Sequence, residues 1–139
     1  MPPLPVARDA ASAAFFDGTA RGELMLRRCE DCTRIGPPPT QTCASCGSAR
    51  LGWTPAQGTG TLVSWTVVHG RPAADGRVTR TVAGLVELAE GPWLHARITD
   101  IAPGDVTAGL PLGAGFCRSG DGEAVPVFHP LAPRSGDAA

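Results

Sequence analysis

Apolar and polar side chains alternate most clearly over residues 61–69, and this two-residue period predicts a β-strand. One face of that strand would carry Val63, Trp65, Val67 and His69, and the other Leu62, Ser64, Thr66 and Val68. Neither face is wholly polar, which is typical of a strand in a closed or well-covered sheet.

Four more short strands are predicted downstream, over residues 81–89, 93–99, 110–117 and 123–128. Their connections are of hairpin length, with Glu90-Gly91 between the first two strands and Ser119-Gly120-Asp121-Gly122 between the last two. The stretch 71–79 contains Pro72 and Asp75-Gly76 and is predicted to be a loop. Five short strands with glycines at the bends predict a mainly β fold that ends in a five-stranded OB-fold barrel.

One helix is predicted, over residues 9–20, where alanines favour helix and either Asp9 or Ser12 can cap it. Its expected apolar face carries Ala11, Phe15 and Thr19. A helix of this length is too short to be stable alone, so it must dock on something. The sequence leaves two partners open, the chain's own barrel and another protein.

Four cysteines form two Cys-x-x-Cys pairs, with ten residues between the pair Cys29 and Cys32 and the pair Cys43 and Cys46. A tight turn between paired cysteines lets both sulfurs face one ion, and tetrahedral zinc takes four thiolates. We therefore predict that these four cysteines bind one structural zinc ion in a compact zinc ribbon, entered by a short strand over residues 23–28. Four protein ligands leave no position for water, so no chemistry is expected there.

Three other interpretations of the cysteine pairs remain open at this point. Two disulfides would need an oxidising compartment, which nothing in the sequence indicates. A thioredoxin-like redox site would need one pair on a helix within a βαβ unit. An iron centre of rubredoxin type uses the same four ligands, so spacing alone leaves zinc and iron open.

Composition lowers the odds of one large function class, general nucleic-acid binding. The formal net charge is −1, and all twelve basic residues are arginine. There is therefore no basic excess to meet a phosphate backbone. The N-terminal stretch lacks the basic and apolar regions of a signal peptide, and no apolar run approaches membrane-spanning length. We expect a cytoplasmic protein without a membrane partner, in which thiols stay reduced and favour metal over disulfide.

No catalytic residue is predicted. The histidines His69, His95 and His129 lie on strands or at strand ends, with no motif that connects them to a nucleophile. Cys117 stands in an apolar strand, where a free thiol usually behaves as a small buried hydrophobe. The largest apolar side chains are expected to anchor the core or the junction between ribbon and barrel; they are Trp53, Trp65 and Trp93. Gly58-Thr59-Gly60 precedes no helix, so it is expected to bend the chain into the barrel and not to cradle a phosphate.

In this order, the motifs resemble those of the DUF35 family. The resemblance spans nearly the whole chain, and its parts are Phe15-Phe16-Asp17-Gly18, Gly22-Glu23-Leu24, the two cysteine pairs with Pro37-Pro38 and Gly47-Ser48, Gly58 to Ser64, and Val86 to Gly91. The chain departs from the family where Thr33 replaces a common glycine, where Ala44 replaces a common proline, and where Pro39-Thr40 stands in place of a basic residue. The last departure puts in doubt a role for a ribbon cation in meeting a CoA phosphate.

The resemblance implies an N-terminal helix and a rubredoxin-like zinc ribbon before an OB-fold. The expected organisation is an extension and helix over residues 1–22, a ribbon over 23–52, an OB-fold over 53–130 and a flexible tail over 131–139. The resemblance also implies a non-catalytic accessory subunit of a hetero-oligomer. Its partner would be a thiolase-like enzyme or a hotdog-fold hydratase, with acyl-CoA at the shared interface and no nucleic acid. A nucleic-acid-binding module is the alternative function.

Overall fold

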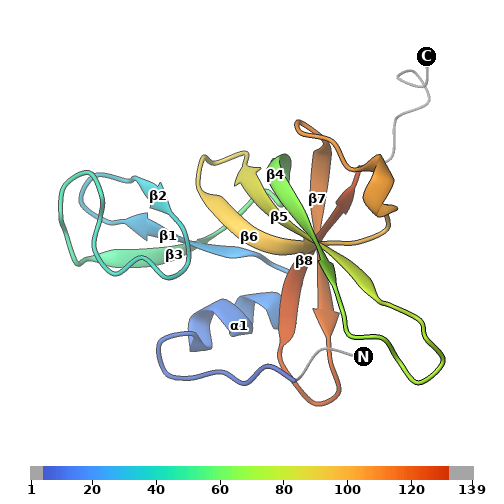
Figure 1. Cartoon of the computed structure of the whole chain (residues 1–139). Coiled ribbons are helices and arrows are strands. Elements are labelled where there is room, and N and C mark those ends of the chain that lie inside the picture. Colours follow the sequence, from blue (N-terminus) through green and yellow to red (C-terminus); the bar gives the residue numbers. More distant parts are fainter. Residues whose placement is uncertain (1–4, 132–139) are drawn as a thin grey trace.

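The computed structural model describes residues 5–131, which form one helix, eight strands and a 3-10 turn (Figure 1). In chain order these elements are α1 (Ala13–Ala20), β1 (Met25–Cys29), β2 (Ile35–Gly36), β3 (Leu51–Pro55), β4 (Thr59–His69), β5 (Arg80–Leu88), β6 (Trp93–Ile98), η1 (Pro103–Asp105), β7 (Pro111–Arg118) and β8 (Ala124–Pro130). The predicted fold class is confirmed: a mainly β chain with one short helix, a cysteine cluster near the N-terminal region and a five-stranded barrel.

Strands β4 to β8 close into a barrel in the order β4-β5-β6-β8-β7. Neighbours pair antiparallel except β6 and β8, which run parallel and meet through only two residue pairs, Arg97 with Val127 and Ile98 with Phe128. At the other closure, β7 pairs with the first residues of β4. Closure leaves no long free edge, and full closure is how small β folds avoid edge-to-edge aggregation.

The second sheet is small and has the order β2-β1-β3, with both pairings antiparallel. It extends to one side of the barrel in Figure 1. Cys29 ends β1, and the other three paired cysteines lie in the loops that follow β1 and β2. Leu24, just before its central strand β1, and Leu26, within that strand, are buried in the same apolar cluster as the barrel side chains. The Leu24 carbonyl also accepts a hydrogen bond of 2.7 Å from the Ala56 N–H, just before the barrel begins. The ribbon and the barrel therefore share one core.

The core consists of aliphatic side chains and one phenylalanine. Its most buried members are Leu24, Leu26, Leu62, Leu88, Leu112, Val86 and Phe128. The expectation that tryptophans anchor the core is wrong for two of them, because Trp65 is 40% exposed and Trp93 is 51% exposed. Trp53 lies in the ribbon sheet, where the Arg27 guanidinium stacks 4.3 Å from its ring. A barrel this small is filled by branched aliphatic side chains, which leaves the indoles outside.

Helix α1 docks on its own chain, against β1 and β8, which is one of the two alternatives that the sequence left open. It begins at Ala13 and not at residue 9, because Asp9 and Ser12 bond each other in a preceding turn. The predicted apolar face is correct in part: Thr19 is buried and Phe15 packs against the core cluster, but Ala11 lies before the helix, and Phe16 and Gly18 are buried as well. A Cβ on Gly18 would lie 2.2 Å from the Met25 side chain, so the missing side chain permits the close approach of helix and strand.

The alternation predicted for β4 is interrupted by a β-bulge between Leu62 and Ser64. The extra residue reverses the side-chain parity along the strand. Leu62 is therefore buried before the bulge, and Val67 packs against the same core after it, although the two were expected on opposite faces. A bulge depends on the pairing with β5, so the period of β4 alone does not reveal it.

The glycines before β4 serve the barrel, as expected. Gly58 has a φ of +90°, which glycine adopts without strain. A Cβ on Gly60 would lie 2.5 Å from the Glu87 carbonyl oxygen, so β4 and β5 approach closely there. The tail predicted over residues 131–139, apart from Leu131, and the first four residues of the predicted extension fall outside the described residues. Within the described part of the chain, α1 is far too short to cross a membrane, and no other α-helix is present.

Candidate metal centre

The first cysteine pair lies in a tight turn at the end of β1. The Thr33 N–H donates to the Cys29 carbonyl at 2.9 Å, and the Cys29 N–H donates to the Arg34 carbonyl at 2.9 Å. These bonds fold the segment between Cys29 and Cys32 so that both sulfurs face the same side. Thr33 has a φ of +66°, in the left-handed region that a β-branched residue rarely adopts. This explains why glycine is common at this position in the family that the sequence resembles.

The second pair repeats this geometry in a separate loop. The Gly47 N–H donates to the Cys43 carbonyl at 2.9 Å, and the Cys43 N–H donates to the Ser48 carbonyl at 2.8 Å. Gly47 occupies the position that Thr33 has in the first turn, with a φ of +74°. The two turns are thus the same local structure, once with glycine at the strained position and once with threonine.

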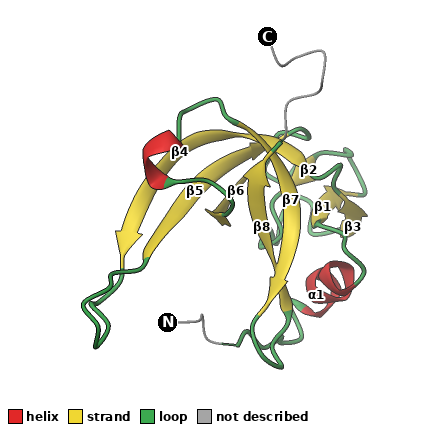
Figure 2. Ribbon diagram, turned by 90° about the vertical axis from the view of Figure 1, so that its right-hand side faces the viewer, coloured by secondary structure: helices red, strands yellow, loops and turns green. Residues whose placement is uncertain are grey.

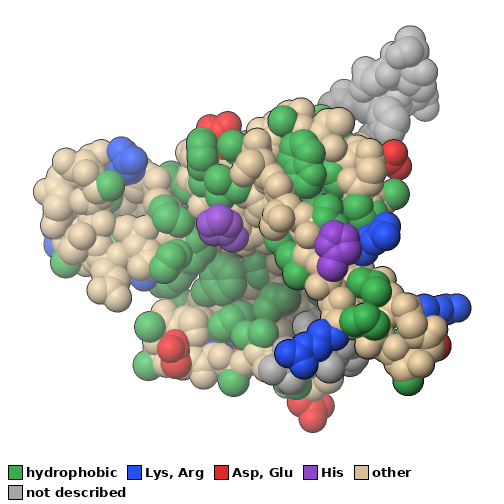
Figure 3. All heavy atoms as spheres, viewed as in Figure 1, with side chains coloured by type: hydrophobic (Ala, Val, Ile, Leu, Met, Phe, Trp, Pro, Cys, Tyr) green, Lys and Arg blue, Asp and Glu red, His purple; other side chains and the backbone are tan. Residues whose placement is uncertain are grey.

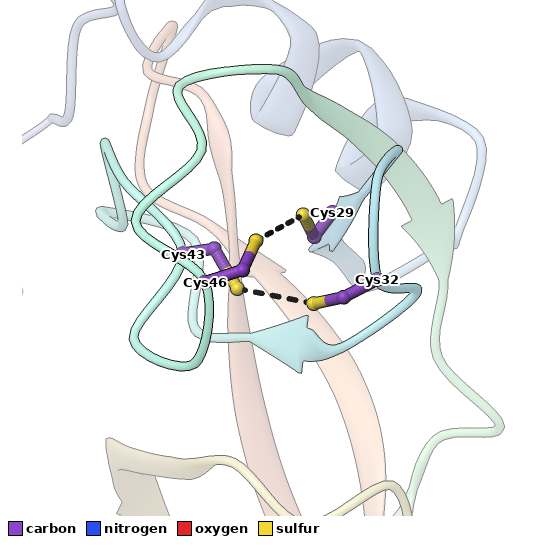
Figure 4. A group of neighbouring side chains, drawn as sticks. All are labelled: Cys29, Cys32, Cys43 and Cys46. Carbon is purple, nitrogen blue, oxygen red and sulfur yellow. Dashed lines mark hydrogen bonds between the residues drawn. The ribbon is translucent and has the colours of Figure 1, made fainter.

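The fold brings the two turns face to face, and Figure 4 shows all four cysteine side chains directed into one space. Their sulfurs lie within 4.8 Å of one another. Cys29 and Cys46 have sulfurs 3.6 Å apart, and those of Cys32 and Cys43 are 3.4 Å apart. Zinc–sulfur bonds of about 2.3 Å in a tetrahedron place sulfurs about 3.8 Å apart. These distances fit four thiolates around one ion and are far beyond a disulfide bond of about 2.05 Å.

The surroundings of the four thiols shift their pKa values in opposite directions. The backbone N–H groups of Cys46 and Ser45 lower the pKa of the Cys43 thiol to about 6. The N–H of Cys32, with a smaller share from Asp31, lowers the pKa of Cys29. Although the Ser48 N–H pulls the pKa of Cys46 down, the surrounding thiols, led by Cys29, and burial raise it to about 12. Four adjacent thiolates repel one another, and a divalent ion among them removes that cost.

Charged side chains hold the two turns together outside the sulfurs. The Asp31 carboxylate accepts hydrogen bonds from the Ser48 hydroxyl and from Arg50 Nη1, the latter at 2.8 Å. Arg34 Nη1 donates to the Ser45 hydroxyl at 2.8 Å, so each turn bonds the other. Sequence reasoning did not single out these residues. The charged residues within and directly after the first cysteine pair could have indicated these contacts between the two turns.

The three histidines lie on three different strands. His69 ends β4 and is paired with Arg80 of β5. His95 of β6 is paired with Leu85 of β5, and His129 of β8 is paired with Gly113 of β7. His69 and His95 are exposed, while His129 is half-buried.

The remaining reactive groups have structural partners. Half-buried Cys117 accepts a hydrogen bond of 3.4 Å from Arg97 Nη2. Glu87 accepts one of 3.3 Å from the Trp93 indole, and Glu90 accepts one of 2.6 Å from the Gln57 N–H. The two carboxylates therefore bond different elements, and neither contacts the cysteine turns through these bonds.

Comparison with known proteins identifies the family. Residues 53–116 match the family described as ChsH2, C-terminal OB-fold domain. A solved structure described as the Ltp2-ChsH2(DUF35) aldolase is 30% identical, with a TM-score of 0.79; the match covers 91% of this chain and 98% of that one. The chain belongs to the DUF35 family. This DUF35 chain also shares its fold with a DUF35 protein of unknown function from Sulfolobus solfataricus, at 17% identity and a TM-score of 0.57 over 78% of each chain.

Two curated proteins are related to this DUF35 chain over part of their length. One is named a probable enoyl-CoA hydratase alpha subunit, from Thermomonospora curvata; it is 32% identical over 123 residues, which are 88% of this chain. The other is named a DUF35 domain-containing scaffold protein, from Pyrococcus furiosus; it is 30% identical over 73 residues, which are 52% of this chain. The match spans only 38% of the first relative and 54% of the second.

Proposed function

We propose that this chain is a zinc-binding accessory subunit without catalysis of its own, which forms a complex with an acyl-CoA enzyme. The observation that carries the proposal is the match over 98% of a DUF35 chain in a structure whose name joins it to a second protein, Ltp2, and calls the pair an aldolase. Two further relatives are named as a hydratase subunit and as a scaffold protein. More specifically, we propose that the partner is a thiolase-like enzyme or a hotdog-fold hydratase, and that this subunit supports the partner's assembly and substrate channel.

The zinc assignment is part of this proposal. Cys29, Cys32, Cys43 and Cys46 would hold one ion, which would contribute folding free energy and would have no open position for a substrate. Iron in the same site is the competing occupant, since the ligands are identical. We also propose the division into an extension and helix over residues 1–22, a ribbon over 23–52 and an OB-fold over 53–130. Burial of Leu24 and Leu26 in the barrel core makes these parts interdependent.

A co-expression experiment tests the proposal. The chain is produced alone and together with the acyl-CoA-enzyme subunit encoded beside it, and both samples are analysed by size exclusion, metal content and acyl-CoA turnover. We expect one zinc per chain, a stable complex, and turnover only when the larger subunit is present. Turnover by the isolated chain would contradict the accessory role. Tight, salt-sensitive binding to single-stranded DNA without a complex would favour the nucleic-acid alternative.

A further inference from the structure

Strands β4 and β5 continue well beyond the barrel as a projecting hairpin, which points away from the body of the molecule in both ribbon views (Figures 1 and 2). We call residues 68–80 the hairpin arm. Every residue in the arm is exposed. The last pair of side chains to reach the barrel core is Val67 with Val82, immediately before the arm begins. The sequence predicted only a loop over residues 71–79, so the length of this projection is a finding of the structure.

The hairpin arm has a regular backbone but no core of its own. The Gly70 N–H donates to the Thr79 carbonyl at 2.7 Å, and the Ala73 N–H donates to the Arg77 carbonyl at 2.8 Å. Val68 pairs with Thr81 at the base of the arm. A two-stranded hairpin that packs on nothing is only marginally stable in water. An ordered but uncovered hairpin is therefore suited to gaining its packing from another molecule.

The arm presents apolar and cationic side chains together. Val68 is 52% exposed and Val78 is 42% exposed, and both are among the large apolar side chains that the described residues leave in solvent. Three arginines accompany them, with one carboxylate, Asp75, which lies 3.5 Å from Arg77 Nε. Within residues 5–131, Arg71 and Arg80 have no acidic group within ion-pair distance. In Figure 3 the tip at the lower right shows blue and green side chains side by side.

We propose that the hairpin arm is a docking element, which inserts into an apolar groove rimmed by carboxylates on the larger enzyme subunit. This inference rests on the proposed function, because the occupant is that same partner. Burial of Val68 and Val78 would supply the apolar centre of the contact, and Arg71 and Arg80 would pair with acidic groups at its rim. Interfaces are enriched in arginine and have apolar centres with polar rims, which is the composition of the arm.

The composition of the arm favours this partner over a second copy of the chain and over single-stranded nucleic acid. In a symmetric contact between two copies, the same patch meets itself, so the unpaired arginines of one arm would face those of the other. Like charges placed together across an interface are unfavourable. Single-stranded nucleic acid would meet the arginines, but the arm contains no Phe, Tyr or Trp on which bases could stack. An acidic, partly apolar protein surface satisfies both kinds of side chain.

The rest of the molecule is consistent with a free arm. On the β7–β8 hairpin, the chain's own N-terminal segment supplies a cover: the Glu123 N–H donates to the Val6 carbonyl at 2.7 Å, and Arg8 pairs with Glu123 at 2.6 Å. Helix α1 packs on β8 beside it. The β4–β5 arm receives no such cover from residues 5–131, as its complete exposure shows.

The test measures the affinity of the chain for the acyl-CoA-enzyme subunit encoded beside it, by calorimetry at two salt concentrations. The first variant carries Arg71→Glu and Arg80→Glu, and the second carries Val68→Ser and Val78→Ser. A third variant replaces residues 69–80 by Asn-Gly, a favoured two-residue hairpin turn, between the paired residues Val68 and Thr81. The control carries Arg21→Glu and Arg118→Glu, which change the charge equally outside the arm. Its thermal unfolding is measured as well, because Arg21 pairs with Glu23 and Arg118 donates to the Gly122 carbonyl.

We expect each arm variant to bind at least about tenfold more weakly, and the arginine variant to lose most of its salt dependence. The control should stay within about twofold of the wild type. The arm variants should keep their metal content and thermal unfolding, because the arm is exposed throughout and lies outside the core cluster. Arm variants that bind as tightly as the control would overturn the arm's role while leaving the proposed function intact.

Two other outcomes are equally informative. Absence of any complex with the unmodified chain would overturn the proposed function and the docking element with it. Oligo-dT is measured in parallel as a nucleic-acid probe. Salt-sensitive oligo-dT binding that the arginine variant loses would assign the arm to nucleic acid and would overturn the protein partner.

Discussion

The ribbon and the barrel are stabilised by different interactions, although Leu24 and Leu26 from the start of the ribbon lie in the barrel core. In the barrel, buried leucine, valine, isoleucine and phenylalanine side chains form a continuous cluster. From residue 27 to residue 60, by contrast, the buried residues are Cys29 and Cys43 alone. The barrel, with Leu24 and Leu26, can therefore fold on apolar burial, whereas the ribbon beyond Leu26 has no buried apolar side chain other than cysteine and depends on what its sulfurs bind. Small units of this kind commonly need a metal or disulfides.

The largest effect should come from removing the metal ligands. A variant with Cys43→Ser and Cys46→Ser would lose zinc binding, which contributes roughly 10 kcal/mol or more in structural zinc sites. We expect the segment between Cys29 and Cys46 to become sensitive to protease while the barrel strands remain protected. Metal analysis and mass mapping of the fragments measure both results. One tightly bound zinc retained by this variant would rule out the proposed ligand set.

The barrel should respond to loss of apolar volume instead. Phe128→Ala removes the largest fully buried side chain and is expected to cost about 3–5 kcal/mol. Urea unfolding monitored by circular dichroism measures this loss. As a control, Trp93→Ala removes a larger side chain that is 51% exposed, and its cost should be smaller. Equal losses from the two variants would contradict the aliphatic core described above.

The two cysteine turns offer a comparison within the ribbon itself. Because Thr33 holds a left-handed backbone that glycine adopts freely, Thr33→Gly should stabilise the metal-bound protein by about 1 kcal/mol. Gly47→Ala should destabilise it by about the same amount, since an added Cβ meets no atom within 4 Å and only backbone strain changes. Thermal unfolding with the metal bound measures both. Shifts of the same sign would show that strain does not control these turns.

The smallest effect concerns the ion pair between Arg8 of the N-terminal segment and Glu123 of the β7–β8 hairpin, which we call the clasp. The hydrogen bond from Arg8 lowers the pKa of Glu123 below its usual value. A depressed carboxyl pKa stabilises the folded state above the unfolded pKa of about 4.3 and ceases to do so as the pH falls through the folded pKa. We expect NMR titration of the Glu123 carboxyl to give a low midpoint, which moves up toward the usual value in Arg8→Ala. An unchanged midpoint in that variant would exclude the clasp.

The spacing of residues along the sequence was sufficient to predict the cysteine cluster and the barrel strands. The two Cys-x-x-Cys pairs predicted that four sulfurs would meet, because each pair folds in a turn that needs only its own backbone. Short alternating segments predicted the five barrel strands to within one or two residues at most ends, since a strand's period is set by its own pleat. The helix start was missed because Asp9 and Ser12 bond each other before the first helical turn.

Tertiary structure decided what depends on contacts between distant segments. Only the assembled barrel shows that Leu24 and Leu26 complete its core, that a bulge reverses the parity of β4, and that Trp65 and Trp93 remain in solvent. The same holds for the hairpin arm, because a valine in a strand is buried or exposed according to what packs on it. Burial is a property of the whole assembly, whereas turn and strand geometry are properties of a few neighbouring residues. The sequence alone therefore predicted the cysteine cluster and the strands but not which side chains stay exposed.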